Sequence, residues 1–484
     1  MNATLPVRTL YGIAALLLAL QVWLISLEWF WYLLLPFVLL VLVWLFFSID
    51  KFFLVATFAA PLSIELDVGG MNLGLSLPCE PMLLALTMMF WLKLLVEKVD
   101  GRGYWRHPLV WVTLVHVGWM AVSTFFSELP EVSLKFLATR IWFTSSMFFL
   151  GIFVFRKNMN IHRFLWMYLL PLSGVVVYTL IRHAGYQFEK QPAHWVMDPF
   201  FQDHTHYGAM LAMFFPFILT AVWAYKTSPF LRMCMLVVLG IMAVGLLMSI
   251  SRAAWLSIIG AAGVFLLMWL RIRWYVVAGG VASLVGMFFL FQTEIIMELE
   301  KTKDVSSGEF VEHFRSATNI RSDASNTERL LRWNAALRMF KERPVTGFGP
   351  GTYQFCYAPY QRSYELTIIS TNFGDGGNAH SEYLGPLAEQ GLPGMLSFIS
   401  LGVVALIIGA RIVYHPLLEA SERWLAYTIL LGLVTYFLHG FLNNFLNTDE
   451  ASVPFWGFMA ILTAMDLQLK QRQLAHEHGS TSIG

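Results

Sequence analysis

Two neighbouring stretches decide the fold class: residues 231–249 read LRMCMLVVLGIMAVGLLMS, and residues 252–270 read RAAWLSIIGAAGVFLLMWL. Each is close to the roughly 20 apolar residues that a helix needs to cross the hydrocarbon core of a bilayer. Only Ile250 and Ser251 separate them, so the pair predicts two membrane helices joined by a very short turn. Similar runs recur along the chain, which predicts an all-α polytopic integral membrane protein.

The composition of the 484 residues supports the same class. Hydrophobic residues make up 57% of the chain and charged residues only 13%, against about 25% charged in a soluble domain. This excludes a soluble enzyme and a disordered protein. The net charge of +1 gives no global field that would attract nucleic acid, so no nucleic-acid partner is expected, whereas membrane lipids are. The three cysteines have neither the pairing of a disulfide framework nor metal-ligand spacing.

About 12–14 transmembrane helices are expected, the first a signal anchor rather than a cleaved signal peptide. The run 51–62 is short and contains Pro61, so whether it spans fully is left open. The expected spans are 8–27, 29–49, 51–62, 80–96, 108–127, 134–155, 163–181, 205–225, 231–249, 252–270, 273–293, 393–411, 422–440 and 452–469.

The distribution of basic residues predicts the orientation. With both termini inside, the segments on that side carry 17 Lys and Arg, and the short outer segments carry 5. Cytoplasmic loops are enriched in these residues, so the termini are expected in the cytoplasm. The predicted organisation is an N-terminal bundle over 1–293, a large periplasmic loop over 294–392, C-terminal spans over 393–469 and a cytoplasmic tail over 470–484.

The long loop has its own expected structure. After a mobile lead-in, the capping box Ser325–Glu328 opens an amphipathic helix that runs to about Arg343. Its apolar stripe is expected to consist of Leu330, Trp333, Leu337 and Phe340. The glycine-rich run 347–351 ends this helix, and Asn378 is expected to cap a short helix that reaches about Gln390 before a turn at 391–394.

Polar residues gather at three predicted helix starts on the outer face. They are Asp203, His204 and His206 before 205–225, Ser251 and Arg252 before 252–270, and Asn378, His380 and Tyr383 after the long loop. Helix starts bind phosphate groups, and an arginine fork suits phosphate oxygens. The residues alone therefore predict an outer-face site for an anionic, phosphorylated and lipidic ligand.

Simpler interpretations exist for each group. Arg252 could be an interfacial arginine whose side chain snorkels to water, and His380 could merely bond to backbone. The Asp-His-Thr-His run could bind a metal, although no further ligand is evident. On the polar side of the loop helix, Arg329 and Arg332 would by default be solvated.

The motifs in this order resemble the O-antigen ligase family, which includes O-antigen polymerases and bacterial O-oligosaccharyltransferases. The matching residues are Ser251-Arg252-Ala-Ala-Trp255; Glu328-Arg329, Trp333 and Ala336; Pro344, Gly347, Gly349, Gly351 and Tyr353; and His380, Tyr383-Leu384, Ala388-Glu389, Gly391-Leu392 and Gly394. The one departure is Ala253, where glycine is frequent.

The resemblance implies an inverting, metal-independent glycosyltransferase with a fold like that of the GT-C membrane glycosyltransferases and no cofactor. It would move a glycan from undecaprenyl pyrophosphate to a hydroxyl of lipid A–core or a similar acceptor, at the periplasmic face of the bacterial inner membrane. His380 would be the base, kept neutral by its helix start, and Arg252 and Arg329 would contact phosphate. Residues expected to bind substrate are Asp203, His204, His206, Ser251, Arg332, Asn378, Tyr383 and Glu389.

Two alternatives stay open. A polymerase could extend the lipid-linked chain itself, and the spacing from Arg338 to Gly349 occurs in some polymerases, although it arises easily by chance. A transporter or flippase would usually place charges at the bilayer midplane between repeats, and the sequence shows neither. A structural or receptor role would leave the three polar helix starts unexplained.

Overall fold

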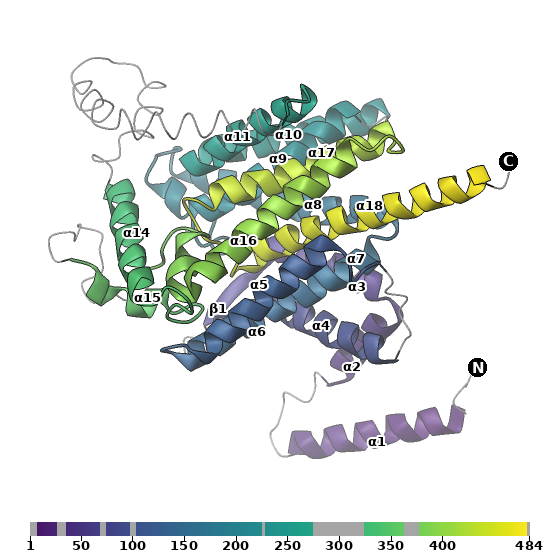
Figure 1. Cartoon of the computed structure of the whole chain (residues 1–484). Coiled ribbons are helices and arrows are strands. Elements are labelled where there is room, and N and C mark those ends of the chain that lie inside the picture. The colour runs from purple at the N-terminus through teal and green to yellow at the C-terminus, as the bar shows by residue number, and fades with distance from the viewer. Residues whose placement is uncertain are drawn as a thin grey trace, which may run out of the picture.

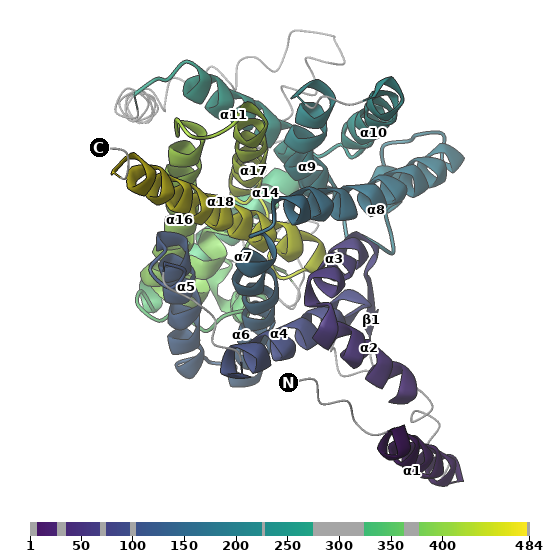
Figure 2. The same cartoon turned by 90° about the vertical axis from the view of Figure 1, so that its right-hand side faces the viewer.

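The bundle is built around the long C-terminal helix α18 (Asp449–Thr481), which is largely buried from Asp449 to Leu469 and exposed from Lys470 to Glu477. In this computed structural model, the described residues are 7–26, 35–67, 74–96, 103–224, 228–273, 324–362 and 377–481. Figures 1 and 2 both show α18 running between the surrounding helices. It packs on α16 (Leu384–Val413), α17 (Ala420–His439) and α7 (Leu150–Val154). An apolar run that is buried on all sides forms the core of such a bundle.

The chain is an all-α polytopic membrane protein. Among the described residues, nine helices are long and apolar enough to cross a membrane. They are Cys79–Val96 (α4), Pro108–Phe125 (α5), Pro130–Val154 (α6 to Phe143, the π-helical segment η3 Thr144–Phe149, and α7), Asn158–Gly185 (α8), His204–Trp223 (within α9, His204–Ala224), Pro229–Met248 (α10), Arg252–Trp269 (α11), Leu384–Val413 (α16) and Asp449–Glu477 (within α18). Each agrees with an expected span.

The remaining expected spans differ in outcome. Helix α17 is as long as several of these nine, but Glu422 and Arg423 in its first turns make it less apolar than they are. Helices α1 (Val7–Ser26) and α2 (Leu35–Phe47) occupy the first two expected runs. The third run forms only a short helix, α3 (Ile49–Ala59), and a 3₁₀ turn, η2 (Ala60–Leu62), that contains Pro61. The span expected at 273–293 and the lead-in of the long loop lie outside the described residues, except for their ends.

A small hairpin follows α3. Strands β1 (Ile64–Asp67) and β2 (Gly74–Leu77) pair antiparallel, with Ile64 opposite Leu77. Two of its polar side chains, Glu65 and Ser76, line the cavity described below. The hairpin therefore forms part of the same end of the bundle as the candidate site.

The helices alternate in direction, so their ends form two opposite faces. We call the end at which α9, α11, α16 and α18 begin the site face; it lies at the left of Figure 1. At the opposite face, Asp466 of α18 bonds to His107 (3.1 Å), Arg411 (2.6 Å) and Lys470 (3.0 Å). This arrangement brings the three polar helix starts of the sequence to one face.

Helix α14 (Ala324–Glu342) stands across the helix ends at the site face (Figure 1). It begins at Ala324, so the predicted capping-box residues lie inside its first turns. The expected apolar stripe is not the buried face of α14, because Leu330 and Leu337 are 38% and 41% exposed. The buried face instead carries Glu328, Arg332, Ala335, Ala336 and Met339. Beside a bilayer, apolar side chains can face lipid, so hydrophobic periodicity alone does not identify the buried face.

Candidate active site

His380 lies in a short loop, not in a helix. The expected short helix begins only at Leu384, and the Asn378 side chain accepts from the His380 backbone N–H (2.9 Å) as a turn instead of capping the helix. His380 has φ +45°, a left-handed conformation that non-glycine residues rarely adopt. Such a conformation persists only where surrounding contacts hold it in place.

Arg332 supplies one such contact from α14. Its Nη1 lies 3.3 Å from His380 Nε2 and also donates to the Asn378 carbonyl (3.1 Å). Its Nε donates to Glu328 (2.9 Å), and its guanidinium lies over the Tyr357 ring. The default expectation of a solvated Arg332 was wrong, because the side chain is buried and joins the loop helix to His380. Because an arginine N–H can only donate, His380 Nε2 is the acceptor here.

The environment of His380 favours the neutral imidazole. Burial lowers its pKa to about 4, and the nearby guanidiniums of Arg332 and Arg329 act in the same direction. The carboxylates of Asp203 and Glu328 oppose this shift but do not outweigh it. His380 is therefore a free base near neutral pH, as expected, but through burial and arginine charge and not through a helix start.

The head of α9 contributes Asp203, His204 and His206. One oxygen of Asp203 accepts from the backbone N–H groups of Thr205 (2.7 Å) and His206 (2.8 Å), and from the Thr205 hydroxyl (2.6 Å). Burial would raise the pKa of Asp203, but these hydrogen bonds outweigh it and lower the pKa. Asp203 is thus the cap of this helix, and as an anion it lies within electrostatic range of His380.

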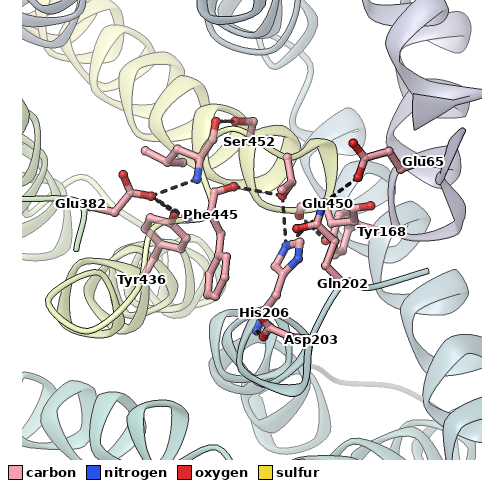
Figure 3. A network of polar contacts seen from close by, with 12 residues as sticks. Glu65, Tyr168, Gln202, Asp203, His206, Glu382, Tyr436, Phe445, Glu450 and Ser452 are labelled. Atoms are coloured by element: carbon pink, nitrogen blue, oxygen red, sulfur yellow. Dashed lines mark hydrogen bonds and ion pairs between the residues drawn. The ribbon is translucent and has the colours of Figure 1, made fainter. Parts of the chain in front are cut away.

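The two histidines of this run point to different partners. His204 Nδ1 lies 3.0 Å from His194 Nδ1, so one ring donates and the other accepts. His206 Nε2 lies 3.1 Å from the Thr448 hydroxyl and 4.0 Å from Glu450, and its ring stacks on Phe445 (Figure 3). Within the described part of the chain, no group of three or more His, Cys, Asp or Glu residues could hold a metal ion.

The glycine-rich run is held against α16. The backbone N–H groups of Phe348 and Gly349 donate to the carbonyls of Ala388 (3.2 Å) and Glu389 (2.7 Å). The buried carboxylate of Glu389 accepts from the Tyr353 N–H (3.0 Å). Glu389 therefore lies inside the site face and fixes the chain that follows α14.

The predicted turn at residue 391 is a kink inside α16. Gly391 has φ +68° and ψ −170°, so a short helix from Leu384 meets the membrane span there. A Cβ at Gly391 would lie 2.1 Å from the Val345 carbonyl oxygen. The sequence thus correctly predicted where the short helix ends and where the chain turns. The chain is helical on both sides of Gly391, so the two helices together form α16.

Ser251 and Arg252 begin α11, as expected. The Ser251 side chain caps the helix by accepting from the Ala254 N–H (3.4 Å), and half-buried Arg252 is its first residue. The turn abuts α9, because a Cβ at Gly208 would lie 2.8 Å from Ser251 Cβ. Arg252 therefore begins a helix that lies directly beside α9, the helix that carries His206.

Glu382 anchors the His380 loop, and the sequence had not singled it out. A single oxygen of this buried carboxylate accepts from the Tyr436 hydroxyl (2.7 Å) and from the backbone N–H groups of Phe445 (2.8 Å) and Leu446 (2.9 Å). Figure 3 shows how this places Glu382 beside the segment that carries the His206 contact. Neighbouring Tyr383 points the other way, donating to the Phe437 carbonyl (2.9 Å) and stacking on Phe441.

Two further buried polar residues were also missed. Arg140 of α6 donates to the Leu446 carbonyl (3.0 Å) and to the Asn447 side chain (3.1 Å). His439 ends α17, is 1% exposed, and its Nε2 has no hydrogen-bond partner among the described residues. The only available signal was a polar residue near the end of an apolar run, which is common at membrane interfaces.

Two cavities flank the His380 loop. A polar cavity of about 800 Å³ is lined by Asn378, Ala379, Ser381 and Glu382 of the loop, and also by Asp203 and Glu389. An apolar groove of about 560 Å³ lies between α16 and α17, where Tyr383, Leu384 and Trp333 line its end at the loop. The loop that carries His380 therefore has a polar compartment on one side and an apolar one on the other.

Comparison with known proteins agrees with the motifs. Residues 237–399, about a third of the chain, match the model of a family described as O-antigen ligase. The matched region contains Arg252, α14, the glycine-rich run and His380. The match confirms the resemblance found in the sequence and supports a ligase- or polymerase-type glycosyl transfer in general. A search of curated proteins found no match.

Proposed function

We propose that the protein transfers a glycan from undecaprenyl pyrophosphate to an acceptor hydroxyl, with His380 as the base, at the periplasmic face of a bacterial inner membrane. The observation that carries this proposal is the contact between Arg332 and the neutral His380. It places an anion-binding group beside a proton acceptor, in a loop that separates an apolar groove from a polar cavity. The transfer needs neither a nucleotide sugar nor a cofactor.

The lipid carrier would lie in the apolar groove. The groove is lined almost wholly by aliphatic and aromatic side chains of α16 and α17, and it reaches the His380 loop at Tyr383. A polyprenyl chain gains free energy there by leaving water or headgroups, and its pyrophosphate would then lie near α14. Arg329 and Arg332, with Arg252 from α11, supply the positive charge that the pyrophosphate needs.

The reaction would be a single displacement. His380 Nε2 takes the proton of the acceptor hydroxyl while the oxygen forms a bond to the anomeric carbon of the donor sugar. The bond from that carbon to the pyrophosphate oxygen breaks, and the pyrophosphate leaves with the electron pair. Arginine contacts stabilise this developing charge, and attack from the opposite side inverts the anomeric centre.

Arg332 would have two successive partners in this scheme. In the structure its N–H covers the lone pair of His380 Nε2. When a pyrophosphate binds, the guanidinium can turn toward the phosphate oxygens, which bind it more strongly than a neutral imidazole does. The lone pair of His380 is then uncovered for the acceptor hydroxyl, so donor binding would precede activation of the acceptor.

The glycan profile of a deletion strain tests the proposal. The strain is complemented with the wild-type gene, with His380→Gln, or with His162→Gln on the exposed opposite face as the matched control. Loss of transfer in the strain that carries His380→Gln, with long lipid-linked chains accumulating, supports a ligase. Accumulation of single lipid-linked repeat units would favour the polymerase. Unchanged lipid-linked and surface glycans in the deletion strain would exclude both.

A further inference from the structure

His116 is a buried histidine in the middle of a membrane-spanning helix. It lies in α5, is 3% exposed and has no role in the proposed reaction. A histidine inside a span brings two polar ring nitrogens into an apolar layer, so it usually faces the protein interior or a water-filled cavity and marks a functional site. Each of its two nitrogens therefore needs a partner or a purpose.

Ser397 of α16 fixes which ring nitrogen of His116 carries the proton. The Ser397 hydroxyl donates its only hydrogen to the Gly394 carbonyl (2.7 Å), and His116 Nδ1 lies 2.9 Å from the same hydroxyl oxygen. Because that hydrogen is already used, Nδ1 must be the donor in the second contact. In the neutral ring that burial favours, the lone pair is then on Nε2. Helices α5 and α16 pack side by side (Figures 1 and 2), so this contact also holds the ring in one orientation.

The lone pair of His116 Nε2 faces the polar cavity. His116 lines that cavity at its end between α5, α6 and α16, together with Met120, Phe136, Arg140 and Phe398. Within the described part of the chain, Nε2 has no hydrogen-bond partner, yet the protein does not enclose this atom completely. A contact that only joined the two helices would need Nδ1 alone. This end of the cavity thus presents an oriented acceptor to a ligand.

The surroundings of His116 indicate which ligand suits this acceptor. Arg140 lies within electrostatic range of His116, and its guanidinium has N–H groups beyond the two that bond to Leu446 and Asn447. A hydroxyl group can donate to Nε2 and accept from an arginine, so it matches both side chains. The oxygens of an ionised pyrophosphate only accept, so they do not match Nε2. The chemistry of this end therefore favours a hydroxyl-bearing ligand over the anionic donor.

We propose that this end of the polar cavity binds a sugar of the acceptor saccharide, and that His116 Nε2 accepts a hydrogen bond from one of its hydroxyl groups. The inference rests on the proposed function, in which the acceptor is the lipid A–core saccharide and the pyrophosphate lies on the other side of the His380 loop. His116 is a binding residue in this scheme, and the proton transfer stays with His380. Loss of the Nε2 lone pair should weaken acceptor binding and leave donor binding unchanged.

Two substitutions separate the two ring nitrogens. His116→Gln can place an amide oxygen near the position of Nε2 but loses the contact with Ser397. His116→Asn can keep an N–H donor toward Ser397 but has no group at the position of Nε2. The probe is the core oligosaccharide released from lipid A–core of the deletion strain, and its binding to the full chain in nanodiscs is measured by calorimetry without a donor.

His116→Asn should bind the core oligosaccharide about three- to tenfold more weakly than the wild type, which corresponds to the loss of one neutral hydrogen bond. His116→Gln should retain most of the affinity, and undecaprenyl pyrophosphate should bind equally to all three proteins. Thr113→Val is the matched control, because Thr113 is buried one turn earlier in α5, lies outside the lining and donates to the Leu109 carbonyl of its own helix (2.8 Å). It should leave the affinity unchanged.

A Gln variant that binds no more tightly than the Asn variant would overturn the inference and leave His116 a packing role. Wild-type affinity in His116→Asn, or no binding to the wild type, would overturn it as well. If His116→Asn does not fold, an O-methylated core oligosaccharide decides, because it has no hydroxyl to donate and must bind the wild type more weakly. Each of these failures leaves the glycan profile of His380→Gln unaffected, whereas failure of the proposed function appears as unchanged glycans in the deletion strain.

Discussion

Arg332 Nη1 and His380 Nε2 lie 3.3 Å apart, although 48 residues separate them in the chain. The contact joins α14 to the loop before α16, and Glu328 holds the other side of the same guanidinium. The protonation and orientation of His380 therefore depend on where α14 lies. A change that moves this helix is expected to alter the base without touching it directly.

Replacing Arg332 tests this dependence. Arg332→Ala should lower the transfer rate by about 10²-fold, the usual cost of losing one group that stabilises developing negative charge. It should also raise the pKa of His380, because the guanidinium lowers it in the wild type. Arg332→Lys should restore part of the rate, since a point charge lacks the planar fork. Lys341→Ala, exposed on the same helix, is the control, and an unshifted pH profile in Arg332→Ala would contradict the coupling.

The choice of base is tested by three histidine variants. His380→Gln should reduce turnover by about 10²- to 10⁴-fold while donor binding persists, as expected for loss of a general base. His206→Gln and His439→Gln should reduce it less, because His206 bonds to Thr448 and His439 ends a helix. Rates come from single-turnover transfer with purified protein. An active His380→Gln beside an inactive His206→Gln would move the role to α9.

The pH dependence follows from the low pKa of His380. With a pKa of about 4, its imidazole is a free base at higher pH, so the transfer rate should be flat from about pH 6 to 8 and fall toward pH 4. The unfolded chain, with a histidine pKa of 6.5, takes up the proton first. The stability contributed by this group is therefore complete above pH 6.5 and is lost as pH falls toward 4. A wild-type rate profile with its midpoint near 6.5 would show an exposed histidine instead.

Orientation in the membrane is tested with single cysteines in a cysteine-free background. Lys190→Cys lies in the exposed segment before α9 at the site face, and Asn158→Cys lies at the start of α8 at the opposite face. In intact, outer-membrane-permeabilised cells, a membrane-impermeant thiol reagent should label only Lys190→Cys. The reverse pattern would place the candidate site in the cytoplasm.

The kink in α16 should be intolerant of any side chain. Gly391→Ala must place a Cβ 2.1 Å from the Val345 carbonyl oxygen, at a φ of +68° and ψ of −170° that essentially only glycine adopts and that alone costs about 1–3 kcal/mol. The melting temperature and the transfer rate should both fall. Gly263→Ala in α11, where a Cβ meets nothing within 4 Å, should leave both unchanged or raise the melting temperature. Equal melting of the two variants would show that the glycine-rich run can shift away.

The sequence predicted the membrane helices well, because lipid imposes a simple length requirement. Helix α11 was expected at 252–270 and occurs at Arg252–Trp269, with Ser251 as its cap. The buried face of α14 was not predictable in the same way, since Leu330 and Leu337 face outward while Arg332 is buried. In water this pattern would be costly, but beside lipid it is not. Glu382 could not be found either, because its partners are the Tyr436 hydroxyl and two backbone groups, all more than 50 residues away.

The position of α18 has a consequence for biosynthesis. All of the helices against which it packs precede it in the chain, and the segment that donates two backbone hydrogen bonds to Glu382 lies directly before it. The centre of the bundle therefore stays open while those helices are being inserted, and His206 has no Thr448 partner until the last one arrives. A chain that ends before the segment preceding α18 would lack both the Glu382 hydrogen bonds and the partner of His206. If the proposed function holds, transfer would thus begin only when synthesis of the chain is nearly complete.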